Sequence, residues 1–230
     1  MTISIDPSIF QIEKNIKIGI IHYTKFTVSE SPQMLKGRIR LYQEHLFIDL
    51  QDKELTEYQG IKEWRGLWKK FGSNPGRYCP SMEALMRRIR NQNYLQPFNS
   101  GVDLNNFFSL QFEIPIGLYD VSHIKGDINI FIGNSKTSLT GINGRDNNLN
   151  GTLTIQDELG PFGSPFIDSI RTTVNEDTVQ ALQIFFLKPS MSKEEAEKLL
   201  TSAGKMFVQV NGGNQDSLIL DKQIMHTPIN

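Results

Sequence analysis

Cys79 is the side chain in this sequence with the most direct route to covalent chemistry. It is the only cysteine, and it stands just before Pro80 and an amphipathic segment that begins at Ser81. A thiol at the N-terminus of a helix can be held as a reactive thiolate. A lone cysteine without a partner motif is usually inert, however, so we interpret Cys79 as incidental. The histidines share no ligand-like spacing with one another or with Cys79, so we expect no metal: His22, His45, His123 and His226.

Two acidic pairs could serve acid–base chemistry, namely Asp49 with Asp52 and Asp157 with Glu158. Neither pair has a histidine converging on it, so we predict that all four are solvated turn residues. The stretch GINGRDNNLNG at 141–151 resembles a phosphate-binding loop, but it lacks the final Lys-Ser/Thr and the strand-to-helix setting of a P-loop. The sequence therefore predicts no cofactor.

The tightest basic cluster consists of Arg87, Arg88 and Arg90, near the end of the segment SMEALMRRIR. Cations in the last turns of a helix suit the helix dipole, so an ordinary solvated face explains them. Contact with RNA phosphates is the alternative. The chain carries 24 basic and 25 acidic side chains, so its net charge does not point to a nucleic-acid partner. Any RNA contact would depend on this local patch, and no DNA is expected.

The whole chain has the composition of an ordinary globular protein, with 230 residues of which 38% are hydrophobic and 21% charged. This length allows a substantial core without disulfides or metals. No apolar run is long enough to cross a bilayer, and MTISIDPSIF lacks the features of a signal peptide. We therefore expect a cytoplasmic protein without a membrane partner.

The first half of the chain predicts one strand followed by helices. IKIGIIHYTKFTV, at 16–28, is rich in β-branched and aromatic residues and reads as a strand. Apolar residues then recur at helical spacing, with Gly72 as a stop for the second helix and Pro80 in the first turn of the third, capped by Ser81 or Cys79. The predicted helices span residues 34–49, 55–71, 80–90 and 100–112.

The second half predicts mostly β-structure. One helix interrupts it, beginning at a capping box of Ser192 and Glu195 and ending at Gly204. The polar stretch at 133–151 predicts either a long hairpin loop or a mobile flap. Short apolar runs between Gly, Asn and Pro signals predict strands within residues 126–134, 151–158, 181–189, 206–212 and 216–222.

The order of these residues resembles a known family. The pattern W-R-x(5)-F-G-x-x-P-x-R-Y at 64–78 is followed by PSMEALMRRI, PFNSGVDLNNFFSLQFEIPIGLYD, GDINI and DSIRTTVNEDT. This composite resembles stand-alone proteins related to the B3/B4 domain of the phenylalanyl-tRNA synthetase β subunit, over about residues 60–210. The resemblance implies an α+β fold of layered β-sheets packed against helices. It also implies a single domain, 1–230, in which 1–59 form an N-terminal strand and helix extension.

The resemblance also implies a function. In the full synthetase this domain hosts the editing site that hydrolyses tyrosine wrongly attached to phenylalanine tRNA. The family's editing histidine corresponds here to Gly117, and the acidic residue that recognises the tyrosine hydroxyl corresponds to Thr173. Both expected side chains are therefore changed. Hydrolysis would then rely on a positioned water, backbone donors and the ribose hydroxyl of the tRNA.

The predicted site lies where residues 99–103, 115–120 and 168–173 converge. Asn99 would position polar groups, and Gly117 would allow close approach of the backbone. Structural alternatives stand beside these roles: Asn99 and Asp103 could be helix caps, Gly117 a turn, and Arg171 an ion-pair partner of Asp168. The residues predicted to bind substrate are Asn99, Asp103, Gly117, Asp168, Arg171 and Thr173.

Three functions stay open at this point. The first is a tRNA-binding protein that hydrolyses mischarged aminoacyl esters. The second is a non-catalytic pocket protein that binds a small amino-acid-like ligand or a protein partner, which the changes at Gly117 and Thr173 favour. The third is a general RNA-binding module that depends on Arg87, Arg88 and Arg90.

Overall fold

A four-stranded antiparallel sheet, in the order β10-β2-β9-β3, forms the centre of the computed structural model, which describes residues 1–229. Alternate residues of its inner strands face two separate hydrophobic clusters: Ile20 and Ile184 face one, and Ile21 and Phe185 face the other. Because both faces of the sheet are covered, the inner strands carry apolar residues at consecutive positions rather than only at alternate ones. The strands are β2 (Ile18–Thr24), β3 (Ile116–Asp120), β9 (Gln180–Phe186) and β10 (Asn214–Leu220).

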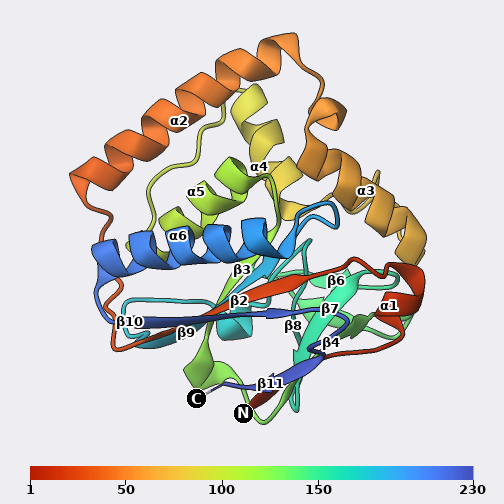
Figure 1. The fold of residues 1–230 in the computed structure, drawn as a ribbon. Helices are drawn as coiled ribbons and strands as arrows, with labels where there is room; N and C mark the ends of the chain where they lie inside the picture. Colours follow the sequence, from red (N-terminus) through yellow and green to blue (C-terminus); the bar gives the residue numbers. More distant parts are fainter. Residues whose placement is uncertain (230) are drawn as a thin grey trace.

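Helices cover one face of this central sheet (Figure 1). α5 (Ser100–Phe112) packs on β3, and α6 (Lys193–Asn211) packs on β10 and β2. α2 (Gln33–Asp52) lies outside them and contacts α4 (Ser81–Arg90). The predicted helices at 34–49 and 100–112 are confirmed.

A second sheet covers the opposite face, together with α1 (Ile9–Ile12) and α3 (Gln59–Phe71). Its order is β11-β1-β4-β7-β8, and only β1 and β4 run parallel. The expected α+β fold with layered sheets and helices is therefore confirmed. The five strands are β1 (Thr2–Ile5), β4 (Ile128–Ile132), β7 (Leu153–Asp157), β8 (Gly160–Gly163) and β11 (His226–Pro228).

The pattern W-R-x(5)-F-G-x-x-P-x-R-Y at 64–78 is structural in this chain. Trp64 and Trp68 are fully buried on α3, and Phe71 is nearly so, as their spacing predicts. Gly72 ends α3 in the left-handed conformation, with φ of 91°. The ring of Tyr78 then packs edge-on against Phe166, 5.1 Å between centroids. This segment therefore ties α3 to the loop that follows β8.

The predicted cap of α4 was wrong. Pro80 itself is the N-cap, and no side chain caps the helix. The Ser81 N–H donates to the carbonyl of Pro165, so a tertiary contact satisfies one of the N–H groups that have no partner within the first turn of the helix. Neither Cys79 nor Ser81 has the predicted role.

The predicted strand at 206–212 was also wrong, because α6 continues through it to Asn211. The capping box of Ser192 and Glu195 is present as expected. Gly204 does not end the helix: it lies inside α6, where an added Cβ would stand 2.4 Å from Oε1 of Gln215 on β10. This glycine therefore allows close helix–sheet packing, and packing of Phe207 in the core overrides the β-like local pattern.

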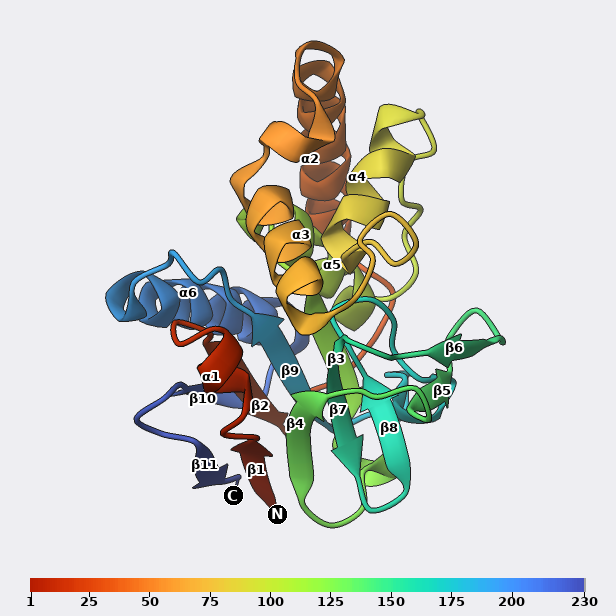
Figure 2. The same ribbon diagram turned by 90° about the vertical axis from the view of Figure 1, so that its right-hand side faces the viewer.

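Residues 133–151 form a hairpin of β5 (Ser138–Thr140) and β6 (Asp146–Asn148), which projects from the second sheet (Figure 2). Of the two predictions for this stretch, the hairpin is the one observed. Gly141 pairs with Ser169, so the hairpin lies beside the segment after β8.

Within residues 1–229, no helix combines the length and apolar composition that a membrane span requires.

Alanine substitutions at two glycines of α3 should change the stability of the protein in opposite directions. A Cβ at Gly60 would lie 1.8 Å from the carbonyl oxygen of Glu113, whereas a Cβ at Gly66 would meet nothing within 4 Å. We expect Gly60→Ala to destabilise the protein by about 2 to 4 kcal/mol through steric conflict. Gly66→Ala should stabilise it by about 0.5 to 1 kcal/mol through helix propensity. Urea unfolding measures both, and equal effects of the two changes would contradict this packing.

Candidate functional site

Tyr119 occupies the point where the two sheets meet. Its side chain is fully buried, and its hydroxyl donates to Oδ1 of Asp168 at 2.6 Å. A Cβ at Gly117 would stand 2.0 Å from this hydroxyl oxygen, and one at Gly163 would stand 2.3 Å from it. Both glycines therefore make room for the phenol ring. The space beside Gly117, where the family resemblance places a histidine, is filled by this chain's own tyrosine.

The carboxyl group of Asp168 is the most perturbed acid of this region. Burial raises the pKa of Asp168 from 3.8 to about 7, although hydrogen bonds from Tyr119 and the Ser164 backbone lower it. Asp168 as a residue is nevertheless partly exposed. A carboxyl group that changes charge near neutral pH has the protonation behaviour of a general base.

The three predicted segments lie close together, but on different sides of strand β3. Thr173 forms an isolated antiparallel bridge with Tyr119. On the other side of β3, a Cβ at Gly101 of α5 would be 3.4 Å from Leu118 and 3.6 Å from Val174. The N-terminal turn of α5, strand β3 and the segment after Asp168 therefore share one region.

Thr173 itself lies at the surface. Its residue is exposed, and its hydroxyl donates to the carbonyl of Ile170 at 3.0 Å. The side chain carries no charge and can still accept a hydrogen bond. Of the predicted residues in this segment, Thr173 is exposed, whereas Asp168 and Arg171 are half-buried.

Asn99 and Asp103 organise the start of α5. Asn99 is the N-cap, and its Oδ1 accepts from the Val102 N–H at 2.8 Å. Asp103 accepts from the hydroxyl of Ser31 at 2.6 Å and from the Phe98 N–H at 3.0 Å. Both side chains are buried, so their polar atoms hold the turn before α5 in place. The helix-cap alternative describes Asn99 fully.

Arg171 does not pair with Asp168, so that alternative was wrong. Its guanidinium forms a two-pronged contact with Asp157, at 2.8 and 2.9 Å, and also donates to the carbonyl of His123. Burial would raise the pKa of Asp157, but hydrogen bonds from Arg171 and the Lys125 backbone hold it below its usual value. Asp157 is therefore a buried ion-pair partner rather than the solvated turn residue predicted from its sequence neighbours.

The three arginines of α4 have different environments. Glu83, fully buried, accepts from Arg65 at 2.9 Å and from Arg87 at 2.6 Å. Burial would raise the pKa of Glu83, but these two arginines hold it below its usual value. Arg90 lies 3.6 Å from Glu54, whereas Arg88 is exposed and forms no ion pair with any residue in 1–229.

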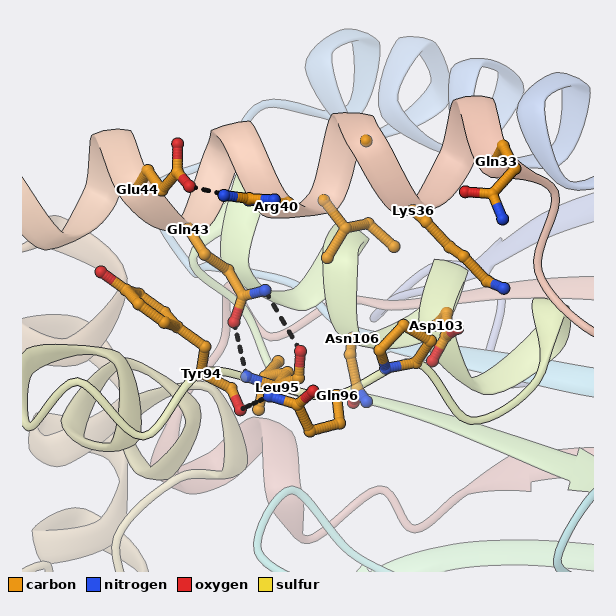
Figure 3. A pocket seen from close by; sticks show the side chains of 13 residues that line it. Gln33, Lys36, Arg40, Gln43, Glu44, Tyr94, Leu95, Gln96, Asp103 and Asn106 are labelled. Carbon is orange, nitrogen blue, oxygen red and sulfur yellow. Dashed lines mark hydrogen bonds and ion pairs between the residues drawn. The ribbon is translucent and has the colours of Figure 1, made fainter.

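A cavity of about 570 Å³ with a mixed polar and apolar lining lies elsewhere, between α2 and the segment that joins α4 to α5 (Figure 3). Lys36 and Arg40 of α2 line it, and Asp103 is the one predicted site residue on its wall. Gln43 holds the far wall in place: its side-chain amide accepts from the Leu95 N–H at 2.7 Å and donates to the Leu95 carbonyl at 3.3 Å. This volume suits a small molecule.

Cys79 is not activated. Burial raises the pKa of the Cys79 thiol, and nearby Glu83 raises it further. A protonated thiol is a poor nucleophile, which agrees with the interpretation of Cys79 as incidental.

In residues 1–229, no group of three His, Cys, Asp or Glu side chains could hold a metal ion.

Sequence reasoning missed Tyr119 as a member of the site. Alternate residues of a strand share a face, so its position two residues after Gly117 was a usable signal for the contact between them. No comparable signal pointed to Gly163, which lies on another sheet. The ion pairs of Glu83 with Arg65 and of Asp157 with Arg171 likewise left no local signal, because each joins residues from different elements.

Comparison with known proteins gives a consistent result. A family model described as the B3/4 domain matches residues 63–207. The protein YhzB of Bacillus subtilis (strain 168) is 32% identical over 214 residues, which are 93% of this chain and 96% of that protein. A phenylalanine–tRNA ligase β subunit of Paramagnetospirillum magneticum is 35% identical over 68 residues. These are 29% of this chain and 8% of the ligase subunit, so the chain spans a small part of that relative.

One solved structure is also similar. It is an N-terminal fragment of the phenylalanyl-tRNA synthetase β subunit from Pyrococcus horikoshii, with 12% sequence identity and a TM-score of 0.44. The similarity covers 94% of this chain and 53% of that one.

Asp168 predicts a specific pH dependence of stability. Between pH 4 and 7 the native carboxyl keeps a proton that the unfolded chain has lost, so the free energy of unfolding falls as the pH rises through this window. Asp168→Asn keeps an acceptor for Tyr119 and removes this loss. At pH 8 we expect the variant to be more stable by up to about 4 kcal/mol, with the gain vanishing near pH 4. Urea unfolding across this range measures the gain; a constant difference would contradict the assignment.

Proposed function

Because the chain belongs to the B3/4 domain family, we propose that it has a tRNA-synthetase-related role, binding tRNA and hydrolysing the ester of a mischarged aminoacyl-tRNA. The observation that carries the proposal is that segments 115–120 and 168–173 meet at the hydrogen bond from Tyr119 to Asp168, with segment 99–103 packed on the other side of β3. All three segments lie within the residues that the family model matches. The substrate class follows from the relative named as a phenylalanine–tRNA ligase subunit.

In this proposal Asp168 is the general base. Its carboxylate takes a proton from a water molecule, and the water oxygen bonds to the ester carbonyl carbon. The bond from that carbon to the ribose oxygen then breaks, and the proton passes from Asp168 to the leaving ribose oxygen. The products are free amino acid and tRNA. No histidine or covalent nucleophile is needed.

Tyr119 has a positioning role. Its hydroxyl fixes one carboxylate oxygen of Asp168, at 2.6 Å, and so orients the other oxygen toward a water molecule. Thr173, at the exposed end of the region, would contact the amino acid side chain through its hydroxyl. Gly117 contributes space for Tyr119 rather than for substrate.

The tRNA backbone would meet α4. Arg88 is exposed and unpaired within residues 1–229, so it can contact phosphate without losing an existing ion pair. Arg87 and Arg90 add positive potential, but each already has an acidic partner. Their contribution to RNA affinity should therefore be smaller than that of Arg88.

The cavity beside α2 favours a second candidate function, binding of a small amino-acid-like ligand. Lys36 and Arg40 could pair with a carboxylate, while Asp103 and Glu44 could accept hydrogen bonds from an ammonium group. The cavity volume of about 570 Å³ exceeds that of a free amino acid. This function requires neither tRNA nor catalysis.

Ester hydrolysis is tested by release of labelled tyrosine from tyrosine-charged phenylalanine tRNA, with the phenylalanine-charged species for comparison. We expect selective release, a rate that rises with pH around an apparent pKa of about 7, and a loss of about 100-fold or more in Asp168→Asn. Asp177→Asn, which changes an exposed carboxylate nearby, should behave like wild type. Release that is equal in wild type and Asp168→Asn would refute the role of Asp168.

RNA contact is tested by binding of uncharged tRNA at several salt concentrations. Arg88→Ala should weaken binding and lower the slope of log affinity against log salt by about one. Lys205→Ala, which removes an exposed cation from α6, serves as the control and should change little. The same affinity and slope in both variants would exclude α4 as the RNA-binding surface.

Ligand binding is tested by thermal unfolding in the presence of each free amino acid at about 10 mM. A ligand that occupies the cavity should raise the midpoint, and Arg40→Ala should abolish the increase. Arg38→Ala changes an arginine that does not line this cavity and should retain it. If no amino acid changes the midpoint while tRNA does, the second candidate function is wrong.

A further inference from the structure

α2 carries an exposed apolar stripe that no part of residues 1–229 covers. Met34, Leu41 and Ile48 are 75%, 68% and 63% exposed. They are seven residues apart, so they lie on one face of this 20-residue helix. The opposite face, which includes Leu35, Leu46 and Leu50, is buried against the protein. Figure 1 shows α2 as the outermost helix, with its outer side free along its whole length.

Gly37 lies on the same outer face, between Met34 and Leu41. A Cβ at this position would meet nothing within 4 Å, so packing inside this chain does not require glycine here. Glycine in a helix interior is destabilising relative to alanine. A small residue within an exposed apolar stripe does, however, let a second helix approach closely.

A groove extends this apolar surface to one side. It lies between α2, α5 and α6, and it has a volume of about 810 Å³. Met34, Gly37 and Leu41 form one wall, and Phe112 and Met206 contribute to the others. The stripe and the groove are therefore one continuous surface, larger than a single row of side chains.

The charges of α2 are separated along its axis around Leu41. The basic residues of the helix precede Leu41 and its acidic residues follow it; they are Lys36, Arg38 and Arg40, and then Glu44, Asp49 and Asp52. Two such helices side by side and parallel would bring like charges together. Antiparallel packing about Leu41 would place each basic half against the acidic half of the other helix.

From these features we propose that α2 is a self-association surface, on which a second copy of this chain packs with its own α2 antiparallel and a two-fold axis near Leu41. Such an interface is isologous, with Met34 opposite Ile48 of the other copy. Arg38 of each copy lies level with Glu44 of the other, which is paired with Arg40 of its own helix in the single chain. A helix of 20 residues is about 30 Å long. Contact over this length corresponds to a modest interface, so the dimer should be weak and its population should depend on concentration.

The test is sedimentation velocity of the full chain from about 1 to about 300 μM. We expect a concentration-dependent dimer, and Leu41→Glu should raise its dissociation constant at least about 10-fold. Leu159→Glu alters a leucine of similar exposure, 60%, in the turn between β7 and β8, and should dimerise like wild type. A wild-type protein that stays monomeric over this range, or equal dimerisation of both variants, would overturn the proposal.

Charge exchange tests the orientation separately. Arg38→Glu and Glu44→Arg should each weaken the dimer, and the double variant should recover at least part of the loss because both opposed pairs are then reversed. Far-UV circular dichroism and thermal unfolding check that each variant is folded. A double variant weaker than both single variants would overturn the antiparallel arrangement.

Discussion

The hydrogen bond from Tyr119 to Asp168 is the interaction on which the arrangement of the site depends. It joins β3 of the central sheet to the segment that follows β8 of the second sheet, and the ring between them fills the space left by two glycines. Around it, the bridge to Thr173 and the ion pair of Arg171 with Asp157 fix the same segment from its other end. The loop that bears Asp168 is therefore held at several points.

The environment of Asp168 favours its proposed role as a base but lowers the stability of the fold. Burial keeps the Asp168 carboxyl partly protonated near neutral pH, which lowers the stability of the fold whenever the group is charged. A structural hydrogen bond to Tyr119 alone could be made by an asparagine at no such cost. A residue that destabilises the native state without need is more often retained for function than for packing, and this supports the proposed role of Asp168.

Much of the fold was predictable from local pattern, and the exceptions have physical reasons. The strands β2 and β9 and the helices α2, α3 and α5 follow from apolar periodicity and clear stop signals. The end of α6 could not be predicted in this way. Gly204 lies inside the helix, where it allows close contact with β10, and the β-like run after it is helical because its side chains pack in the core. At the site, family resemblance pointed to the segments that lie around β3. The pairing of Arg171 with Asp157 and of Glu83 with Arg65 could not be predicted, since pairing across elements leaves no trace in local sequence.

The filling of the space beside Gly117 by Tyr119 also constrains how such a protein can change over generations. A histidine introduced at position 117 would collide with the phenol ring, and loss of the ring alone would open a cavity between the sheets. Either substitution alone is unfavourable, whereas a histidine at position 117 together with a smaller residue at position 119 is compatible in volume. The residues at positions 117 and 119 are thus coupled through volume, so a change at one of them is tolerated only together with a compensating change at the other.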